Sequence, residues 1–424
     1  MRKIYIIITL FAVVISTLAC DILDQYPHNA VSRDSVSEAD LELLCTGLYC
    51  YSQYKPSFEG YFQNDMAGGD FYRGGGTVFP DAPTWIRDCM LANSGWTGVA
   101  YNGYYAWLYQ VNSFIAMAES ADQTTKVKQM MGVAYYFRAL IYYNLTTKYR
   151  EVPILDKPTN EAIAKSSEQD CWNFVNADLD KALELCPVYS TKNYVSIQAA
   201  KALAARAYIA QGRKAEAAQL AEELIADPLF ALADFDKIFR GEDNKEEIFT
   251  FANLKEENGI TFAGNFIQPA TIYVPTPETI AQFASDDKRA SLSVASDGDE
   301  TVLYKYISSS TTDPIIISRL SEMYLISAEG KGVSGGGLDR LNELRAFRGL
   351  ANVKPAPTTD AQLLDAVLAE RRLEFLGEGF RWYDLVRTGK YMEKTGLPEK
   401  YTVFPLPQRE LDLNKNLIQN TLWQ

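Results

Sequence analysis

Apolar residues recur at helical spacing along most of this chain. Within the stretch 104–119, for example, Leu108, Val111 and Ile115 fall on one face of a helix. The same period predicts helices over residues 38–51, 104–119, 127–148, 167–185, 196–211, 214–226, 315–328, 338–348 and 360–376. The pattern therefore predicts a mainly α-helical protein.

The predicted helices on either side of Gly212 form an antiparallel pair. Tyr208, Gly212 and Ala217 stand at tetratricopeptide-like offsets, and Pro228 lies close to the position of that repeat's terminal proline. Each such pair has an apolar face that only a stacked neighbour can cover. We therefore expect a scaffold of stacked, tetratricopeptide-like helix pairs.

Two long segments, near 52–100 and 255–316, lose the helical period. The first is rich in glycine, aspartate and aromatic residues. Structureless loops of this length in a compact domain are usually functional or disordered, and the aromatic content argues against disorder. We expect ordered, irregular segments that display a binding site.

The first 19 residues have the layout of a secretory signal peptide. Arg2 and Lys3 precede an apolar run of about 15 residues, which is shorter than a bilayer-spanning helix requires. Cleavage after this segment leaves a tether, residues 20–36, and a body, residues 37–424, that we expect to be a single domain.

The apolar run ends at Leu18-Ala19-Cys20, which resembles a bacterial lipobox. Thr17 departs from that motif, which prefers leucine at this position. We therefore expect the thiol of Cys20 to carry a lipid. Two or more acyl chains would give durable membrane anchoring. The alternative is an ordinary signal peptide with an unmodified Cys20.

The mature chain is strongly acidic. Without Arg2 and Lys3, the 41 basic residues fall to 39 against 54 acidic residues, a net charge of −15. Such a surface repels phosphate backbones, so nucleic acid is not an expected partner.

Histidine and cysteine usage excludes several kinds of site. The single histidine, His28, falls in the expected tether, so the folded body cannot build a histidine-based triad or metal cluster. Cys171 and Cys186 stand about 22 Å apart on one predicted helix, too far for a disulfide. No motif nominates a metal ion or a cofactor.

The C-terminal third carries several recognisable motifs. Residues 319–329 are similar to an "RLAExYLxxAE" helix and residues 341–346 to an "LNxxRxR" stretch, and both resemble motifs of the SusD/RagB family. Residues 370–375 and 378–387 are close to "ERRxEL" and "EGxRWxDLxR". The "FPIPxxE" ending is matched from Phe404 onward, while Ser321, Gly330 and Phe347 depart from the family's usual residues.

This resemblance implies a helical core with a loop-rich lid region, on the outer membrane of Bacteroidota-type bacteria. It implies a surface lipoprotein that captures an oligosaccharide, or a peptide in some members. The partner that it implies is a TonB-dependent, SusC-like transporter, which receives the cargo without any bond chemistry.

A block of charged residues near the C-terminus has two interpretations. Its members fall largely at helical i, i+3 and i+4 spacings, which allow ion pairs along and between helices. We expect a structural network rather than a catalytic carboxylate pair, with the members Glu370, Arg371, Glu374, Glu378, Arg381 and Asp384.

Aromatic residues in the irregular segments are the candidates for ligand binding. Sugar rings pack their C–H faces on aromatic rings, while carboxylate, amide and guanidinium groups bond their hydroxyls. The candidates are Trp96, Trp85, Tyr72, Asn102, Tyr101, Asp70, Arg73 and Tyr273. The alternative is that many of these rings belong to the core, as we expect for Tyr105.

Four functions remain open from the sequence. Glycan capture for uptake is the first, and peptide capture by the same fold is the second. A glycoside hydrolase would need two carboxylates about 5–10 Å apart, and no motif nominates such a pair. A scaffold without a ligand would leave the aromatic-rich segments unexplained.

Overall fold

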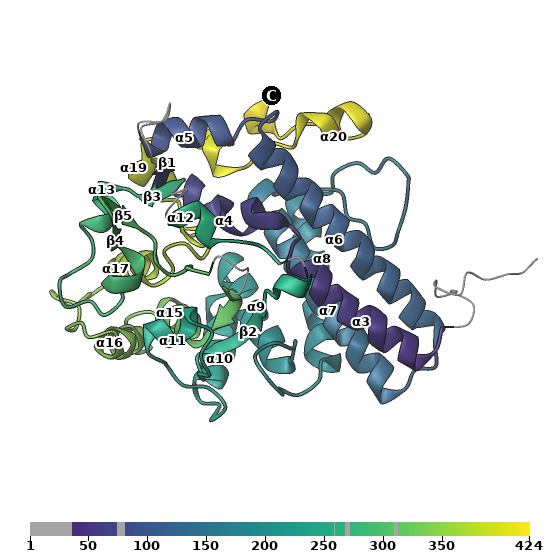
Figure 1. The fold of residues 1–424 in the computed structure, drawn as a ribbon, viewed down its shortest axis with the longest axis horizontal. Coiled ribbons are helices and arrows are strands. Elements are labelled where there is room, and N and C mark those ends of the chain that lie inside the picture. Colours follow the sequence, from purple (N-terminus) through teal and green to yellow (C-terminus); the bar gives the residue numbers. More distant parts are fainter. Residues whose placement is uncertain (1–35, 74–80, 258, 268–271, 309–312) are drawn as a thin grey trace, which may run out of the picture.

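The computed structural model describes residues 36–424 except 74–80, 258, 268–271 and 309–312 (Figure 1). The expected signal peptide, Cys20, His28 and nearly all of the tether therefore lie outside the described residues. No helix in the described part of the chain is both long enough and apolar enough to span a membrane.

Four long helices gather on one side of the molecule in Figure 1: α3 (Glu38–Ser52), α6 (Gly95–Ser120), α7 (Thr125–Tyr149) and α8 (Glu168–Leu185). Each follows a serine or threonine whose hydroxyl accepts a hydrogen bond from an amide of the first turn. Such caps satisfy amides that have no partner within the helix. The other three helices pack against α7, which is buried along most of its length.

Helix pairs form the second part of the scaffold. The pair α9 (Ile197–Ala210) and α10 (Lys214–Ile225) turns at Gly212, whose φ of +74° favours glycine. The pair α15 (Leu320–Lys331) and α16 (Gly337–Phe347) is followed by α17 (Asp360–Glu374). The prediction of a mainly helical protein built on helix pairs is confirmed.

Close packing joins these helix pairs to one another. Helix α10 packs against α15, and a Cβ atom at Gly330 would lie 2.6 Å from the carbonyl oxygen of Lys214. Glycine at position 330, one of the departures from the SusD/RagB motif noted above, therefore permits this close approach.

Short helices complete the chain. They are α4 (Ser57–Ala67), α5 (Ala82–Cys89), α11 (Phe235–Phe239), α12 (Ala263–Phe266), α13 (Pro277–Ile280), α14 (Ala290–Ser293), α18 (Arg381–Arg387), α19 (Tyr391–Thr395) and α20 (Gln408–Leu413), with 3₁₀ turns at Lys255–Glu257, Glu399–Thr402 and Thr421–Trp423. Of those labelled in Figure 1, α13 and α19 lie on the side opposite the four long helices, whereas α20 lies at the top of the view.

The described strands form three antiparallel pairs. Strand β1 (Phe71–Arg73) pairs with β3 (Tyr273–Pro275), β2 (Glu247–Phe251) pairs with β6 (Ile315–Arg319), and β4 (Ala295–Asp297) pairs with β5 (Glu300–Val302). In the first pair, Arg73 lies opposite Tyr273. This pair joins the two segments for which the sequence showed no period.

The expectation of an irregular segment near 52–100 is wrong for most of its length. It contains α4, α5, β1 and the first turns of α6. These helices bury Phe62, Met66, Trp85 and Ile86 against the rest of the protein. Tertiary packing stabilises such short helices more than their own pattern does, which explains why the period was weak.

The helix predicted over 315–328 is two elements. The β-branched run Ile315–Ile316–Ile317 forms β6 beside β2, and α15 begins only at Leu320. Short apolar runs fit a buried strand as well as a helix, so periodicity does not distinguish them.

A large apolar core lies between the long helices and the rest of the protein, and a smaller one lies between α15, α16 and α17. The larger core contains buried residues from both the N-terminal and the C-terminal thirds, such as Leu41 and Leu417. Among the described cysteines, Cys45, Cys89, Cys171 and Cys186 are free thiols.

Candidate functional site

Three of the aromatics predicted to bind ligand lie together. The ring centroids of Trp85 in α5, Trp96 in α6 and Tyr273 in β3 are between 5.6 and 5.8 Å apart. Phe58 of α4 stacks on Tyr273, with centroids 6.1 Å apart, and meets the edge of Trp96. We call Phe58, Trp85, Trp96 and Tyr273 the aromatic cluster.

Most of the aromatic cluster is covered by protein. Trp85 is 3% exposed and Tyr273 is 6% exposed, whereas Trp96 is half-buried. A ring that binds a sugar needs an accessible face. Of the three candidates in the cluster, Trp96 is therefore the one suited to direct contact, while Trp85 and Tyr273 hold it in place.

Tyr101 and Asn102 follow in α6 but lie elsewhere. Tyr101 is 4% exposed and packs against Tyr105 and Tyr149, with centroids 4.8 and 5.1 Å apart. Asn102 lines a shallow depression of about 650 Å³ between the start of α6 and α20. Asn93 and Gln408 also line this depression, so amide groups are available there for hydroxyls.

A larger groove, of about 940 Å³, lies between α5, α13, α17, α18 and α19. In Figure 1 the labelled members of this set are on the side opposite the four long helices. Tyr72, half-buried, lines the groove together with Gly68 and Gly69. We call this feature the groove; its volume is in the range of small-molecule sites.

Asp70 lies beneath the groove and is fully buried. Its Oδ1 accepts a hydrogen bond from Arg372 Nε at 2.7 Å and a longer one from the Thr279 hydroxyl. Arg381 Nε is 3.8 Å from the other carboxylate oxygen. The backbone of Arg73 pairs with Tyr273 in the strand pair β1–β3.

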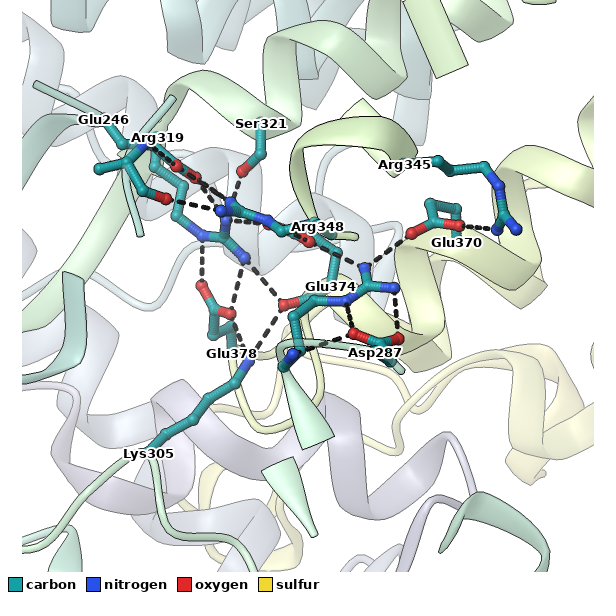
Figure 2. Close-up of polar contacts among 12 residues, drawn as sticks. Glu246, Asp287, Lys305, Arg319, Ser321, Arg345, Arg348, Glu370, Glu374 and Glu378 are labelled. Atoms are coloured by element: carbon teal, nitrogen blue, oxygen red, sulfur yellow. Dashed lines mark hydrogen bonds and ion pairs between the residues drawn. The ribbon is translucent and has the colours of Figure 1, made fainter. Parts of the chain in front are cut away.

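The charged block forms a buried network (Figure 2). Glu374 lies between three guanidinium groups, those of Arg289, Arg319 and Arg348. The remaining members bring charges from several other elements to the same place. We call the set Glu246, Asp287, Arg289, Lys305, Arg319, Arg345, Arg348, Glu370, Glu374 and Glu378 the charge network.

The charge network shifts the pKa values of its members. Burial alone would raise the pKa of Glu374, but the guanidiniums of Arg348, Arg319 and Arg289 hold that pKa well below its usual range. Burial lowers the pKa of Lys305 to about 8, against the opposing effect of Glu378. Glu374 therefore stays ionised, and no proton-transfer role follows from its environment.

The six residues predicted to form one network separate into three groups. Glu370, Glu374 and Glu378 belong to the charge network. Arg371 pairs with Asp384 at 2.6 Å, and Arg387 connects Asp384 to Glu329. Arg381 instead faces Asp70 beside the groove.

Sequence reasoning missed several residues of these sites. Arg289, Arg348 and Glu246 of the charge network, and Arg372 of the groove, were not singled out. Their partners are up to 302 residues away in the chain, as for Arg372 and Asp70, so no local spacing connects them. Among the described residues, no group of three or more histidine, cysteine, aspartate or glutamate side chains is arranged to hold a metal ion.

Comparison with models of known protein families identifies the family of this chain. The model of the SusD family matches residues 156–402, more than half of the chain. The chain belongs to the SusD family. A second model, described as "Starch-binding associating with outer membrane", matches residues 21–209 of this SusD family member.

Individual relatives agree with this assignment. SusD-like protein P38 of Formosa agariphila is 26% identical in an alignment 418 residues long. That alignment covers 80% of this chain and 83% of that protein. The fold matches surface glycan-binding protein A from Bacteroides fluxus with a TM-score of 0.78 at 22% identity, over 91% of this chain and 100% of that one. A laminarin-binding SusD-like protein matches with a TM-score of 0.76, the same identity and the same coverage. The predicted SusD-like fold is confirmed.

Proposed function

We propose that this protein is a lipid-anchored binding protein on the outer surface of the outer membrane. It captures an oligosaccharide and passes it to a TonB-dependent transporter of the SusC type. The observation that carries the proposal is the SusD-like fold, shared with proteins described as laminarin-binding and glycan-binding. The family description "associating with outer membrane" supports the location.

Trp96 is the proposed contact for a sugar ring. Its indole packs against Trp85, Tyr273 and Phe58, so its orientation is fixed before ligand arrives. A rigid, partly exposed ring gives stacking without a large loss of side-chain entropy. Asn102 lies elsewhere on α6, in the shallow depression, and is a separate candidate for contact with sugar hydroxyls.

Substituting Trp96 with alanine is expected to weaken binding of the best glycan from a panel by about 10-fold or more, because a stacking face is lost. Isothermal titration calorimetry measures this effect. Tyr194→Ala, which removes a ring that is 57% exposed and lies outside the aromatic cluster, is the matched control and should bind as the parent does.

Unchanged affinity of the Trp96→Ala protein for its glycan would contradict the assignment of Trp96 as a sugar contact. A panel in which no glycan binds, while peptides co-purify with the protein from its native host, would point to peptide capture instead.

Substituting Cys20 with alanine is expected to release the exported protein from the membrane fraction, because the thiol that carries the lipid is gone. Fractionation and immunoblotting measure the distribution, and Cys50→Ala is the control that should stay membrane-bound. Recovery of the Cys20→Ala protein in the membrane would contradict lipid anchoring. A transporter that co-purifies with the parent after detergent extraction would support the proposed complex.

A further inference from the structure

Arg381 is a nearly buried guanidinium that the described residues do not fully hydrogen-bond. Its side chain is only 10% exposed, and it lines the groove. Its Nε atom is buried and makes no hydrogen bond to any described residue. The 3.8 Å to Asp70 is too long for a hydrogen bond, although the two charges still attract each other.

Asp70 only partly completes the environment of Arg381. Its Oδ1 is bonded by Arg372 and Thr279, and its Oδ2, which faces Arg381 Nε at 3.8 Å, makes no hydrogen bond to a described residue. Two guanidiniums therefore share one buried carboxylate. Burial lowers the pKa of Arg381; attraction to Asp70 opposes this effect, whereas repulsion from Arg372 adds to it.

The backbone holds Arg381 in this position. A Cβ atom at Gly68 would lie 2.6 and 2.8 Å from two carbons of the Arg381 side chain, so a larger residue at position 68 would displace it. The stem of Arg381 thus packs directly against Gly68, at the C-terminal end of α4. A guanidinium fixed in this way loses little conformational entropy when it binds an anion.

The groove separates its charges by depth. On the floor of the groove, the side chains of Arg372 and Arg381 are 11% and 10% exposed. At the rim, Glu278, Glu393 and Asp365 are 74%, 67% and 58% exposed, and the last two pair with Lys394 and Lys390. On the floor, two guanidiniums face the one buried carboxylate of Asp70, so the floor carries one more positive than negative charge, and solvent and salt screen it less than the rim.

We propose that the groove binds the carboxylate of an acidic saccharide through Arg381. A carboxylate accepts two parallel hydrogen bonds from a guanidinium, which a neutral hydroxyl does not. Tyr72 also lines the groove and offers an aromatic surface to the sugar ring. The inference rests on the proposed function, since it names the class of oligosaccharide that is captured.

The test compares polygalacturonate oligosaccharides with the same oligosaccharides after reduction of their carboxyl groups. Calorimetry on the parent protein should give an affinity about 10-fold or more higher for the acidic form. Arg381→Gln should reduce that affinity about 30-fold, and Arg381→Lys should reduce it less. Arg213→Gln, which changes the arginine immediately before α10 that pairs with Glu216, is the matched control and should leave both affinities unchanged.

Salt dependence provides a readout that needs no substitution. Between about 50 and about 500 mM NaCl, the affinity of the parent protein for the acidic form should fall several-fold, while that for the reduced form should stay nearly constant. Thermal unfolding of Arg381→Gln separates loss of binding from loss of fold.

Equal affinity for the two forms, without salt dependence, would overturn the inference and leave the proposed glycan capture intact. A protein that binds no glycan of any charge would contradict the proposed function itself. Binding of acidic peptides that depends on Arg381, without binding of acidic saccharides, would show that the carboxylate belongs to a peptide and would overturn the saccharide assignment.

Discussion

Substituting Glu374 with glutamine is expected to lower the free energy of unfolding by about 4 kcal/mol, or to prevent folding altogether. Glutamine keeps the shape of the side chain but removes the charge that Arg289, Arg319 and Arg348 share. Three buried guanidiniums would then depend on the remaining carboxylates. Leaving buried charges without a counter-charge is among the most destabilising single changes in a protein.

Urea unfolding followed by circular dichroism measures this difference. The control is Glu42→Gln, which removes the partner of Lys126 in an ion pair whose side chains are 57% and 47% exposed. Its expected effect is below about 1 kcal/mol, because exposed ion pairs contribute little. Equal stability changes in the two variants would show that the charge network is not a structural requirement.

Substituting Lys148 with methionine is expected to stabilise the protein by about 3 kcal/mol at about pH 6. Lys148 is fully buried, and its ammonium group bonds only the carbonyl oxygen of Gly60 and the hydroxyl of Tyr104 among the described residues. Burial lowers the pKa of this lysine from 10.5 to about 7. Methionine fills the same space without a charge, and the Tyr104 hydroxyl still donates to Gly60.

The pH dependence of this effect has a definite sign. Between about pH 7 and about pH 10.5 the unfolded chain holds a proton on Lys148 that the folded protein has lost, so parent stability rises with pH in this window. The advantage of Lys148→Met should therefore be largest near pH 6 and should shrink as the pH approaches 10. Lys305 titrates in both proteins, so its contribution cancels in the difference. An advantage that does not change with pH would rule out a lowered Lys148 pKa.

Much of the fold could be predicted because its long helices carry their own signals. The expected range 167–185 matches α8 closely, and the hydroxyl of Ser167 caps that helix. Short elements were lost because their stability comes from distant partners. Helix α5, for example, buries Trp85 against Trp96 and Tyr273, which no local pattern reveals.

The candidate site was predictable in kind but not in arrangement. The sequence named Trp85, Trp96 and Tyr273 as ligand candidates, and they do lie together. It could not show that two of them are covered, because burial depends on what packs above a ring. The groove could not be predicted from the sequence, because Arg372 and Asp70 come together only in the folded protein.

The charge network also constrains how an incomplete chain behaves. Arg289, Arg319 and Arg348 all precede α17 in the chain, while Glu370, Glu374 and Glu378 lie in or just after that helix. A chain that ends before α17 therefore carries the cations without most of their counter-charges. Such a fragment cannot bury these side chains at low cost, so it stays open to proteases until the last helices arrive. Completion of the chain and closure of its interior are thereby coupled.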